Sequence, residues 1–307
     1  MILLFPGQGS QKPGMAKDLA DAFPQAKAVF DRADAALGMS LSSLCFEGPA
    51  EALLQTNNAQ PALLAHSAAV WAIVKDHIGA RVTGASGHSL GEFSAYHAAG
   101  ALPLEDALKL VRTRGQLMFE TGQQVPGAMA AILGHPTRTI EEICTEASPT
   151  GGVVPANYNT LEQVVISGEV PAVERAMELA RQYGAKKVVR LPVSGAFHSP
   201  LMAPAVAGLT AALETARWRD PSVPVWSNVT GEAIGDAGTA KALLIRQLTS
   251  PVRWVEVVRN MAARFPGTTF VEMGTGHVLS ALVRRLAPDC LSVTCGTVPE
   301  VEALLKA

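Results

Sequence analysis

The pentapeptide Gly87-His88-Ser89-Leu90-Gly91 constrains the fold of this chain more than any other segment. Gly-x-Ser-x-Gly is the pattern of a sharp strand-to-helix turn that exposes a serine hydroxyl. A helical stretch over residues 92–99 follows, and its first N–H groups would lie near negative charge developing at the serine. A chance glycine-serine turn has the same pattern, but the strand–turn–helix context favours a functional serine. We therefore expect an α/β fold with Ser89 as a nucleophile.

The rest of the chain alternates between predicted strands and helices. The apolar run Ile2–Phe5 is stopped by Pro6-Gly7, which is typical of a buried strand. Such alternation favours a mostly parallel sheet. The other predicted elements are helices over residues 61–79, 104–120 and 204–216, a strand over 223–227, and a last strand, Thr269–Met273, that leads into a helix through residue 285.

The segment between Pro126-Gly127 and Pro192 has a different pattern. Its predicted order is strand, helix, strand, strand, helix, strand, which is the ferredoxin-like βαββαβ unit. We expect residues 1–126 and 193–307 to form an α/β-hydrolase-like core with a parallel sheet. Residues 127–192 would form a small ferredoxin-like subdomain inserted into that core.

Composition excludes several classes of protein. Hydrophobic residues make up 48% of the 307 residues and charged residues 17%, as in a globular enzyme rather than a disordered chain. A formal net charge of −2 gives no reason to expect binding to nucleic acid or to an anionic membrane. The four cysteines show no metal-ligand spacing, so we expect reduced thiols and no metal. No signal peptide or membrane-spanning run is recognised, and we expect a cytoplasmic monomer.

A serine nucleophile needs a base, and the chain has seven histidines. Five have structural explanations, because they lie in predicted helices, near element ends, or next to the serine and pointing away from it: His66, His77, His88, His97 and His135. His198 lies in a loop after the inserted segment. His277 follows the last predicted strand, where an α/β-hydrolase keeps its catalytic histidine. The residues alone leave His198 and His277 as nearly equal candidates.

A second glycine-rich segment, Phe5-Pro6-Gly7-Gln8-Gly9-Ser10-Gln11, follows the first predicted strand. It fits neither the P-loop pattern nor the dinucleotide-binding pattern Gly-x-Gly-x-x-Gly, so we do not expect a phosphate site there. A strand end followed by Gly-Gln-Gly can instead supply a backbone N–H to an oxyanion hole.

These segments together indicate a family. In chain order they are residues 5–11, the turn at 87–91 with Glu92, Arg-Thr-Arg-Gly at 112–115, Asn-Tyr-Asn at 157–159, and residues 163–168, 195–202 and 247–254. Each motif is weak alone, but the ordered set is highly specific. The chain resembles the malonyl-CoA:acyl-carrier-protein transacylase family nearly from end to end.

The resemblance implies a ping-pong transfer of a malonyl group from malonyl-CoA to the phosphopantetheine thiol of acyl carrier protein, without a cofactor. Ser89 would be the nucleophile. His198 would be the general base, oriented by the backbone carbonyl of Gln247. The backbone N–H groups of Gln8 and Leu90 would form the oxyanion hole.

The substrate-binding residues that the resemblance implies are Arg114, Met118, Asn159 and Phe197. Arg114 would pair with the free malonyl carboxylate, which is costly to bury unpaired and which a planar guanidinium suits. Most arginines are solvated helix residues, and Arg112 fits that explanation better. Met118 would line the acyl pocket one helical turn after Arg114, and Asn159 would lie in the cleft beside the insert. The Phe197 ring would crowd a substituent on the malonyl α-carbon.

Two other functions share parts of this pattern. A thioesterase or lipase-like hydrolase would use the same turn, but Arg114 and the Gly-Gln-Gly loop argue against it. A non-catalytic subunit that docks acyl carrier protein is disfavoured by the complete set of Ser89, His198 and Arg114. For a transferase, the sequence leaves fatty acid synthesis, polyketide synthesis and malonate decarboxylation as alternative pathways.

Overall fold

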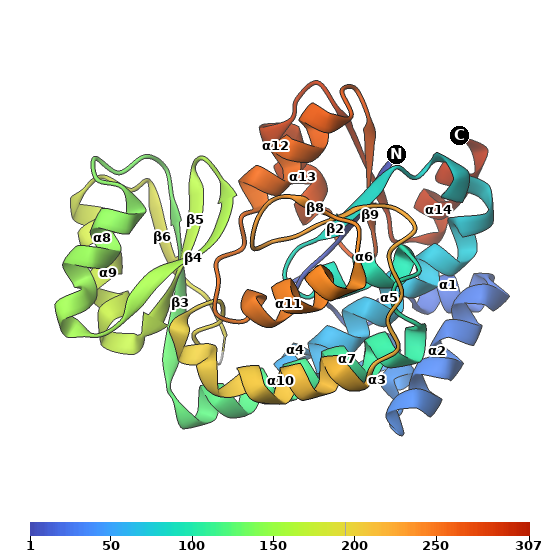
Figure 1. Cartoon of the computed structure of the whole chain (residues 1–307), viewed down its shortest axis with the longest axis horizontal. Helices are drawn as coiled ribbons and strands as arrows, with labels where there is room; N and C mark the ends of the chain where they lie inside the picture. The colour runs from blue at the N-terminus through green and yellow to red at the C-terminus, as the bar shows by residue number, and fades with distance from the viewer. Residues whose placement is uncertain (194) are drawn as a thin grey trace.

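A six-stranded sheet forms the larger part of the computed structural model, which describes residues 1–193 and 195–307 (Figure 1). Its strands are β1 (Ile2–Phe5), β2 (Gly84–Gly87), β7 (Val225–Trp226), β8 (Ala233–Ile234), β9 (Thr269–Met273) and β10 (Leu291–Cys295). They lie in the order β10-β9-β1-β2-β7-β8, and every neighbouring pair except β7 with β8 is parallel. The expected α/β fold with a mostly parallel sheet is confirmed.

Helices cover both faces of this sheet (Figure 1). Successive side chains of β1 point to opposite faces. Leu3 and Phe5 pack into one core with α5 (Thr56–Ile78), α6 (Gly91–Ala98), α7 (Leu104–Gln124) and α10 (Ala203–Thr215). Ile2 and Leu4 pack into another with α12 (Trp254–Arg264) and α13 (Val278–Leu286). The other helices are α1 (Lys17–Ala22), α2 (Pro24–Leu37), α3 (Leu41–Glu47), α4 (Ala50–Leu54), α11 (Ala237–Gln247) and α14 (Val298–Lys306), with short 3₁₀ turns at Gly79–Arg81, Ser148–Thr150 and Pro200–Met202.

Helix α5 begins at Thr56, five residues before Pro61, which the sequence predicted as its start. Pro61 has no N–H to donate to the carbonyl of Asn57, four residues earlier. The Arg112 guanidinium donates to that carbonyl instead, with Nη1 2.6 Å from the oxygen. Arg112 is therefore half-buried against α5, and the prediction that it is a solvated helix residue was wrong.

The sequence prediction also missed one edge of the sheet. β10 follows α13, so Thr269–Met273 is not the last strand. Leu291 and Val293 are exposed to solvent because β10 lies at the edge. The strand Leu-Ser-Val-Thr-Cys consequently lacks the continuous apolar run that identifies a central strand.

The inserted segment folds into a four-stranded antiparallel sheet that lies beside the larger sheet, at the left of Figure 1. Its elements are β3 (Gly127–Leu133), α8 (Ile140–Ala147), β4 (Val153–Thr160), β5 (Gln163–Glu169), α9 (Val170–Gln182) and β6 (Lys187–Arg190). This is the predicted βαββαβ order, with strands arranged as β4-β5-β3-β6. Ala130 and Ile132 of β3 pack with α8 and α9, whereas Met129 and Ala131 pack with the core of the larger sheet.

The order of the large sheet decides which loops meet. Segments that follow parallel strands lie beyond the carboxyl ends of those strands, at one edge of the sheet. Because β1, β2 and β7 are neighbours, the segments that begin at Pro6, His88 and Ser227 lie side by side. β9 lies on the far side of β1, so the turn with His277 is farther from Ser89. Within the described ranges, no helix is long and apolar enough to cross a membrane.

Candidate active site

Ser89 occupies the turn between β2 and α6 with a left-handed backbone, φ 52°, which is strained for a residue other than glycine. Two flanking glycines make this turn possible. A Cβ at Gly87 would lie 2.0 Å from the Gly91 carbonyl, and a Cβ at Gly91 would lie 2.1 Å from the Phe5 carbonyl oxygen. Larger residues would separate α6 from the two strands, so the Gly-x-Ser-x-Gly pattern is a steric requirement of this packing.

The Ser89 hydroxyl contacts His198. Ser89 Oγ lies 2.7 Å from His198 Nε2, and His198 Nδ1 lies 2.9 Å from the backbone carbonyl oxygen of Gln247. Since a carbonyl oxygen only accepts, Nδ1 donates to it, and Nε2 of the neutral ring accepts from the serine. His277 is exposed at the start of α13. Of the two candidate histidines, the structure therefore brings only His198 to Ser89.

The environment of His198 keeps its ring neutral. Burial, and secondly the positive charge of Arg114, lower the pKa of His198 to about 3. At pH 7 the ring can therefore accept a proton. Like Ser89, His198 has a left-handed backbone, with φ 57°. Backbone strain at both residues of a contacting pair is typical of a functional site.

Arg114 is a buried cation, 1% exposed, whose side chain reaches the serine from α7. Its Nη2 lies 3.1 Å from Ser89 Oγ and 2.9 Å from Gln247 Oε1, and Nη1 lies 2.8 Å from Gln60 Oε1. Burial lowers the pKa of Arg114 to about 10, so the guanidinium is still charged at pH 7. In the described chain it has amide and hydroxyl partners but no carboxylate bonded to it. It is therefore available to a negatively charged ligand.

A cavity of about 320 Å³ opens beside Ser89. Its apolar wall contains Met118 and Phe197, both predicted to contact substrate. Gln8 and Leu90 also line it, and no acceptor among the described residues takes their backbone N–H groups. The lining residues are Gln8, Gly9, Gln11, Leu54, His88, Ser89, Leu90, Arg114, Met118, Met129, Asn157, Leu191, Pro192, Val193, Phe197 and His198.

Asn159 lies away from its predicted place and contacts His88. Asn159 does not line the cavity, because its side-chain oxygen pairs with His88 Nε2 at 2.9 Å; Asn157, two residues earlier on β4, lines it instead. His88 is among the residues that line the cavity, but its ring contacts Asn159 and packs against the ring of Trp254, with centroids 5.4 Å apart. Neither of these partners lines the cavity, so the ring has structural contacts.

Sequence reasoning gave no role to three polar residues that support the site. Asn228 Oδ1 accepts the Ser89 N–H at 2.6 Å, and its Nδ2 donates to the Gly87 carbonyl at 2.8 Å, so Asn228 fixes the turn on both sides of the serine. Gln60 holds Arg114, and Glu92 contacts Asn228. The signal for Asn228 is a polar residue directly after a predicted strand. Glu92 was named with the turn, and its place among apolar residues was the signal for a buried role.

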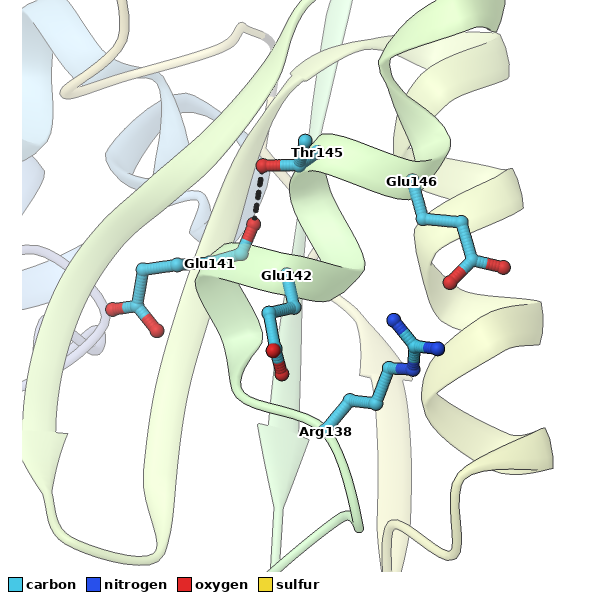
Figure 2. A pocket seen from close by; sticks show the side chains of 5 residues that line it. All are labelled: Arg138, Glu141, Glu142, Thr145 and Glu146. Atoms are coloured by element: carbon cyan, nitrogen blue, oxygen red, sulfur yellow. Dashed lines mark hydrogen bonds between the residues drawn. The ribbon is translucent and has the colours of Figure 1, made fainter.

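Another hollow, on the surface beside α8, differs from this site (Figure 2). It is lined by Arg138, Glu141, Glu142, Thr145 and Glu146. The polar groups have structural partners: Glu142 forms a capping box with the start of α8, Glu146 accepts from a tyrosine hydroxyl, and the Thr145 hydroxyl donates to the Glu141 carbonyl. These contacts stabilise the small helix, whereas Ser89 and His198 line the other cavity.

Comparison with known proteins agrees with this geometry. Residues 2–291 match the family described as the acyl transferase domain. The chain is 47% identical over 287 residues to the malonyl CoA-acyl carrier protein transacylase of Bacillus subtilis, a match that covers 93% of this chain and 90% of that protein.

Solved structures give the same result over the full length. The acyl-carrier-protein-S-malonyltransferase of Bartonella henselae superposes with a TM-score of 0.95 at 43% identity, covering 99% of this chain and 98% of that one. A malonyl-transacylase solved in complex with a type II PKS acyl-carrier protein superposes with a TM-score of 0.94 at 38% identity, covering 99% of this chain and 98% of that one. The chain therefore belongs to the malonyl-CoA:acyl carrier protein transacylase family of acyl transferase domains.

Proposed function

We propose that this chain transfers a malonyl group from malonyl-CoA to the phosphopantetheine thiol of acyl carrier protein through an ester on Ser89. One observation supports this most strongly: Ser89 Oγ lies between His198 Nε2, at 2.7 Å, and Arg114 Nη2, at 3.1 Å. A base and a permanent cation at one hydroxyl suit an acyl group that has its own carboxylate. The names of the malonyl transacylases that the chain matches support the same substrates.

In the first half-reaction, Ser89 Oγ attacks the thioester carbonyl carbon while His198 Nε2 takes the hydroxyl proton. The carbonyl oxygen becomes an oxyanion, which the backbone N–H groups of Gln8 and Leu90 would stabilise. The carbon–sulfur bond then breaks, and the leaving CoA sulfur takes the proton from His198. A malonyl ester of Ser89 remains.

The second half-reaction runs by the same steps in reverse. The phosphopantetheine thiol of the carrier gives its proton to His198 and attacks the ester carbonyl. The bond to Ser89 Oγ breaks, and the serine recovers the proton from His198. One thioester replaces another, and the free enzyme returns without a cofactor.

Arg114 would select the acyl group. A carboxylate that enters the cavity loses its water, which is costly unless a cation takes its place. A guanidinium can donate two parallel hydrogen bonds to a carboxylate, and Arg114 already points at the hydroxyl that would carry the ester. An acetyl group gains nothing from this cation.

The inserted segment would close the cavity. We propose that residues 127–192 act as a subdomain against the core of residues 1–126 and 193–307. Cavity residues from this segment are Met129, Asn157, Leu191 and Pro192. The carrier-bound malonyl group would supply fatty acid or polyketide synthesis, and we propose that the enzyme works as a cytoplasmic monomer.

A partition experiment tests the function. Radiolabelled malonyl-CoA is incubated with the protein and holo-acyl carrier protein, and the label is counted on the carrier and in free malonate. We expect transfer to the carrier thiol to exceed hydrolysis by ~10-fold or more, because a well-oriented acceptor outcompetes bulk water. Label released mainly as malonate would instead indicate a thioesterase, and label in neither product would contradict the proposal.

A further inference from the structure

Glu92 is a buried carboxylate in the first turn of α6 that contacts the supports of the site and not the reacting atoms. Its Oε2 accepts from Gln247 Nε2 at 2.7 Å and from the Asn228 backbone N–H at 3.1 Å. Its Oε1 has no hydrogen-bond partner among the described residues. Gln247 and Asn228 are the residues that contact Arg114 and Ser89, so Glu92 lies one residue away from each.

The Gln247 side-chain amide depends on Glu92 for its orientation. Gln247 Oε1 accepts from Arg114 Nη2 at 2.9 Å, while Nε2 donates to Glu92 and, at 3.1 Å, to the Ser89 carbonyl. Rotating this amide by half a turn would place its NH₂ against the guanidinium and its oxygen against the carboxylate. Both contacts would be repulsive, because a guanidinium only donates and a carboxylate only accepts.

The charge arrangement favours the same role. Glu92 is the carboxylate that partly offsets the buried charge of Arg114, yet the Gln247 amide separates the two groups. A carboxylate bonded directly to Arg114 would occupy the guanidinium and exclude a substrate carboxylate. With the amide between them, the cation is partly compensated and still open toward Ser89.

The groups around Glu92 come from several elements. Arg114 faces it from α7, Tyr96 from its own helix, and Ser227 and Asn228 from the segment after β7. Burial is the largest effect and raises the pKa of Glu92 to about 7, against the hydrogen bonds and the charge of Arg114. A proton on the unpartnered Oε1 would leave Oε2 free to accept, so the orientation of Gln247 is kept in both protonation states.

We propose that Glu92 is a positioning residue for acyl selection: it orients the Gln247 side chain, which holds the Arg114 guanidinium toward the acyl group on Ser89. The inference rests on the proposed function, since it concerns the choice of malonyl over other acyl groups. It extends the site to a residue that touches neither substrate nor nucleophile side chain.

The test measures kcat/KM for malonyl-CoA and acetyl-CoA in the wild type, Glu92→Leu and Glu92→Gln, with thermal unfolding of each. Leucine has a similar size and no acceptor, so we expect the malonyl-to-acetyl ratio to fall by ~10–100-fold, the usual effect of losing hydrogen bonds to a charged group. Glutamine keeps an oxygen that can accept from Gln247 and Asn228, and we expect a ratio within ~3-fold of the wild type.

Glu272 offers a matched control, because it is also fully buried and accepts two backbone N–H groups, from Leu279 and Ser280. Glu272→Leu should lower the unfolding temperature and leave the acyl ratio unchanged. Should Glu92→Leu fail to fold, Gln247→Met removes the amide between Glu92 and Arg114 and should reduce the ratio in the same way.

Three results would contradict the role of Glu92 or the function on which it rests. A folded Glu92→Leu or Gln247→Met variant with the wild-type ratio would overturn it. An equal loss of both activities together with a lower unfolding temperature would show a purely structural role and would also overturn it. A wild-type protein without malonyl preference would contradict the proposed function itself, whereas a preference that survives the loss of Glu92 contradicts only the role of Glu92.

Discussion

Two strand-to-helix turns of the large sheet are built alike and have different uses. One joins β2 to α6 and contains Ser89; the other joins β9 to α13 and contains His277. Each lies at the carboxyl edge of the sheet, has glycines in the turn and has a buried glutamate beside it. In the second turn, Glu272 accepts from the N–H groups of Leu279 and Ser280, at the start of its own helix.

In the first turn, the glutamate accepts hydrogen bonds from distant segments and not from the start of its own helix. Glu92 bonds to Asn228 and Gln247, and the N–H of Leu90, at the start of α6, has no acceptor in the described chain. The start of a helix leaves several N–H groups without an intrahelical partner, and negative charge near them is stabilising. Gly91 and Glu92 donate to the carbonyls of His88 and Ser89 within the turn, so the Leu90 N–H is left for a ligand. In this fold the site therefore lies at the turn whose buried acid contacts distant segments and leaves an N–H open.

Replacing the two histidines should give the largest contrast between the turns. His198→Ala removes the group that accepts the serine proton, and we expect turnover to fall by ~10²–10⁴-fold. His277 is exposed and lies outside the cavity, so His277→Ala should stay within ~2-fold of the wild type. Steady-state transfer of malonyl to carrier protein measures both. If His277→Ala lost far more turnover than His198→Ala, the general base would be His277, in the second turn.

The two arginines of α7, Arg112 and Arg114, should give the next largest difference. Loss of a buried cationic partner costs about 3–5 kcal/mol, so Arg114→Ala should lower kcat/KM for malonyl-CoA by ~10²–10⁴-fold and leave acetyl transfer equal or higher. Arg112→Ala should lower stability by ~1–3 kcal/mol, because it strips the Asn57 carbonyl of its donor, with the acyl preference unchanged. Equal loss of both activities in Arg114→Ala would point to a structural role.

Glu92 should also make the free energy of unfolding depend on pH. Its folded pKa of about 7 lies above the ordinary value of 4.5, so the folded state binds the proton more tightly than the unfolded state. Ionisation between pH 4.5 and 7 therefore destabilises the wild type, by about 1–3 kcal/mol relative to Glu92→Gln, which cannot ionise. His198 titrates in both proteins, so its effect cancels in the difference.

Urea unfolding of the two proteins at pH 5 and pH 8 measures this difference. The free energy of unfolding of Glu92→Gln should rise relative to that of the wild type as the pH increases. A difference that does not change with pH would mean that Glu92 keeps an ordinary pKa, and the contrast between the two turns would then lie only in hydrogen bonding.

The smallest expected effect concerns Phe197, whose ring lines the cavity next to His198. A methyl group on the malonyl α-carbon should meet this ring, so the wild type should use methylmalonyl-CoA ~10-fold less well than malonyl-CoA, a typical cost of one misfitting methyl group. Phe197→Ala should bring the kcat/KM values for the two esters closer together. Equal kcat/KM values for the two esters in the wild type would remove Phe197 from acyl selection.

Local patterns made much of the fold predictable. The glycine-flanked turn, the apolar strand Ile2–Phe5 and the βαββαβ insert are each defined by neighbours in sequence, and all were predicted. The start of α5 was not, because a guanidinium from another helix compensates for Pro61. The edge strand β10 was missed because exposure removes its apolar signal.

The site was predictable where a motif marks it and unpredictable where distant segments meet. The choice between His198 and His277 required the strand order, which no local pattern contains. The contacts of Glu92 join residues 136 and 155 positions apart, so neither partner could be inferred from the sequence around it. Asn157 and Asn159 lie two residues apart on β4, where a regular strand would place both on one face. The irregular pairing of β4 with β5 and the contact of Asn159 with His88 leave only Asn157 of the two in the cavity wall, and no local pattern shows either.

Ser89, and no group of the second turn, should hold the malonyl group between the two half-reactions. The most direct measurement is mass spectrometry of the protein quenched after incubation with malonyl-CoA and without a carrier, followed by peptide mapping of the adduct. We expect one malonyl ester, on the peptide that contains Ser89, and no adduct on Ser89→Ala. A malonyl adduct on any other residue, or one that persists in Ser89→Ala, would contradict it.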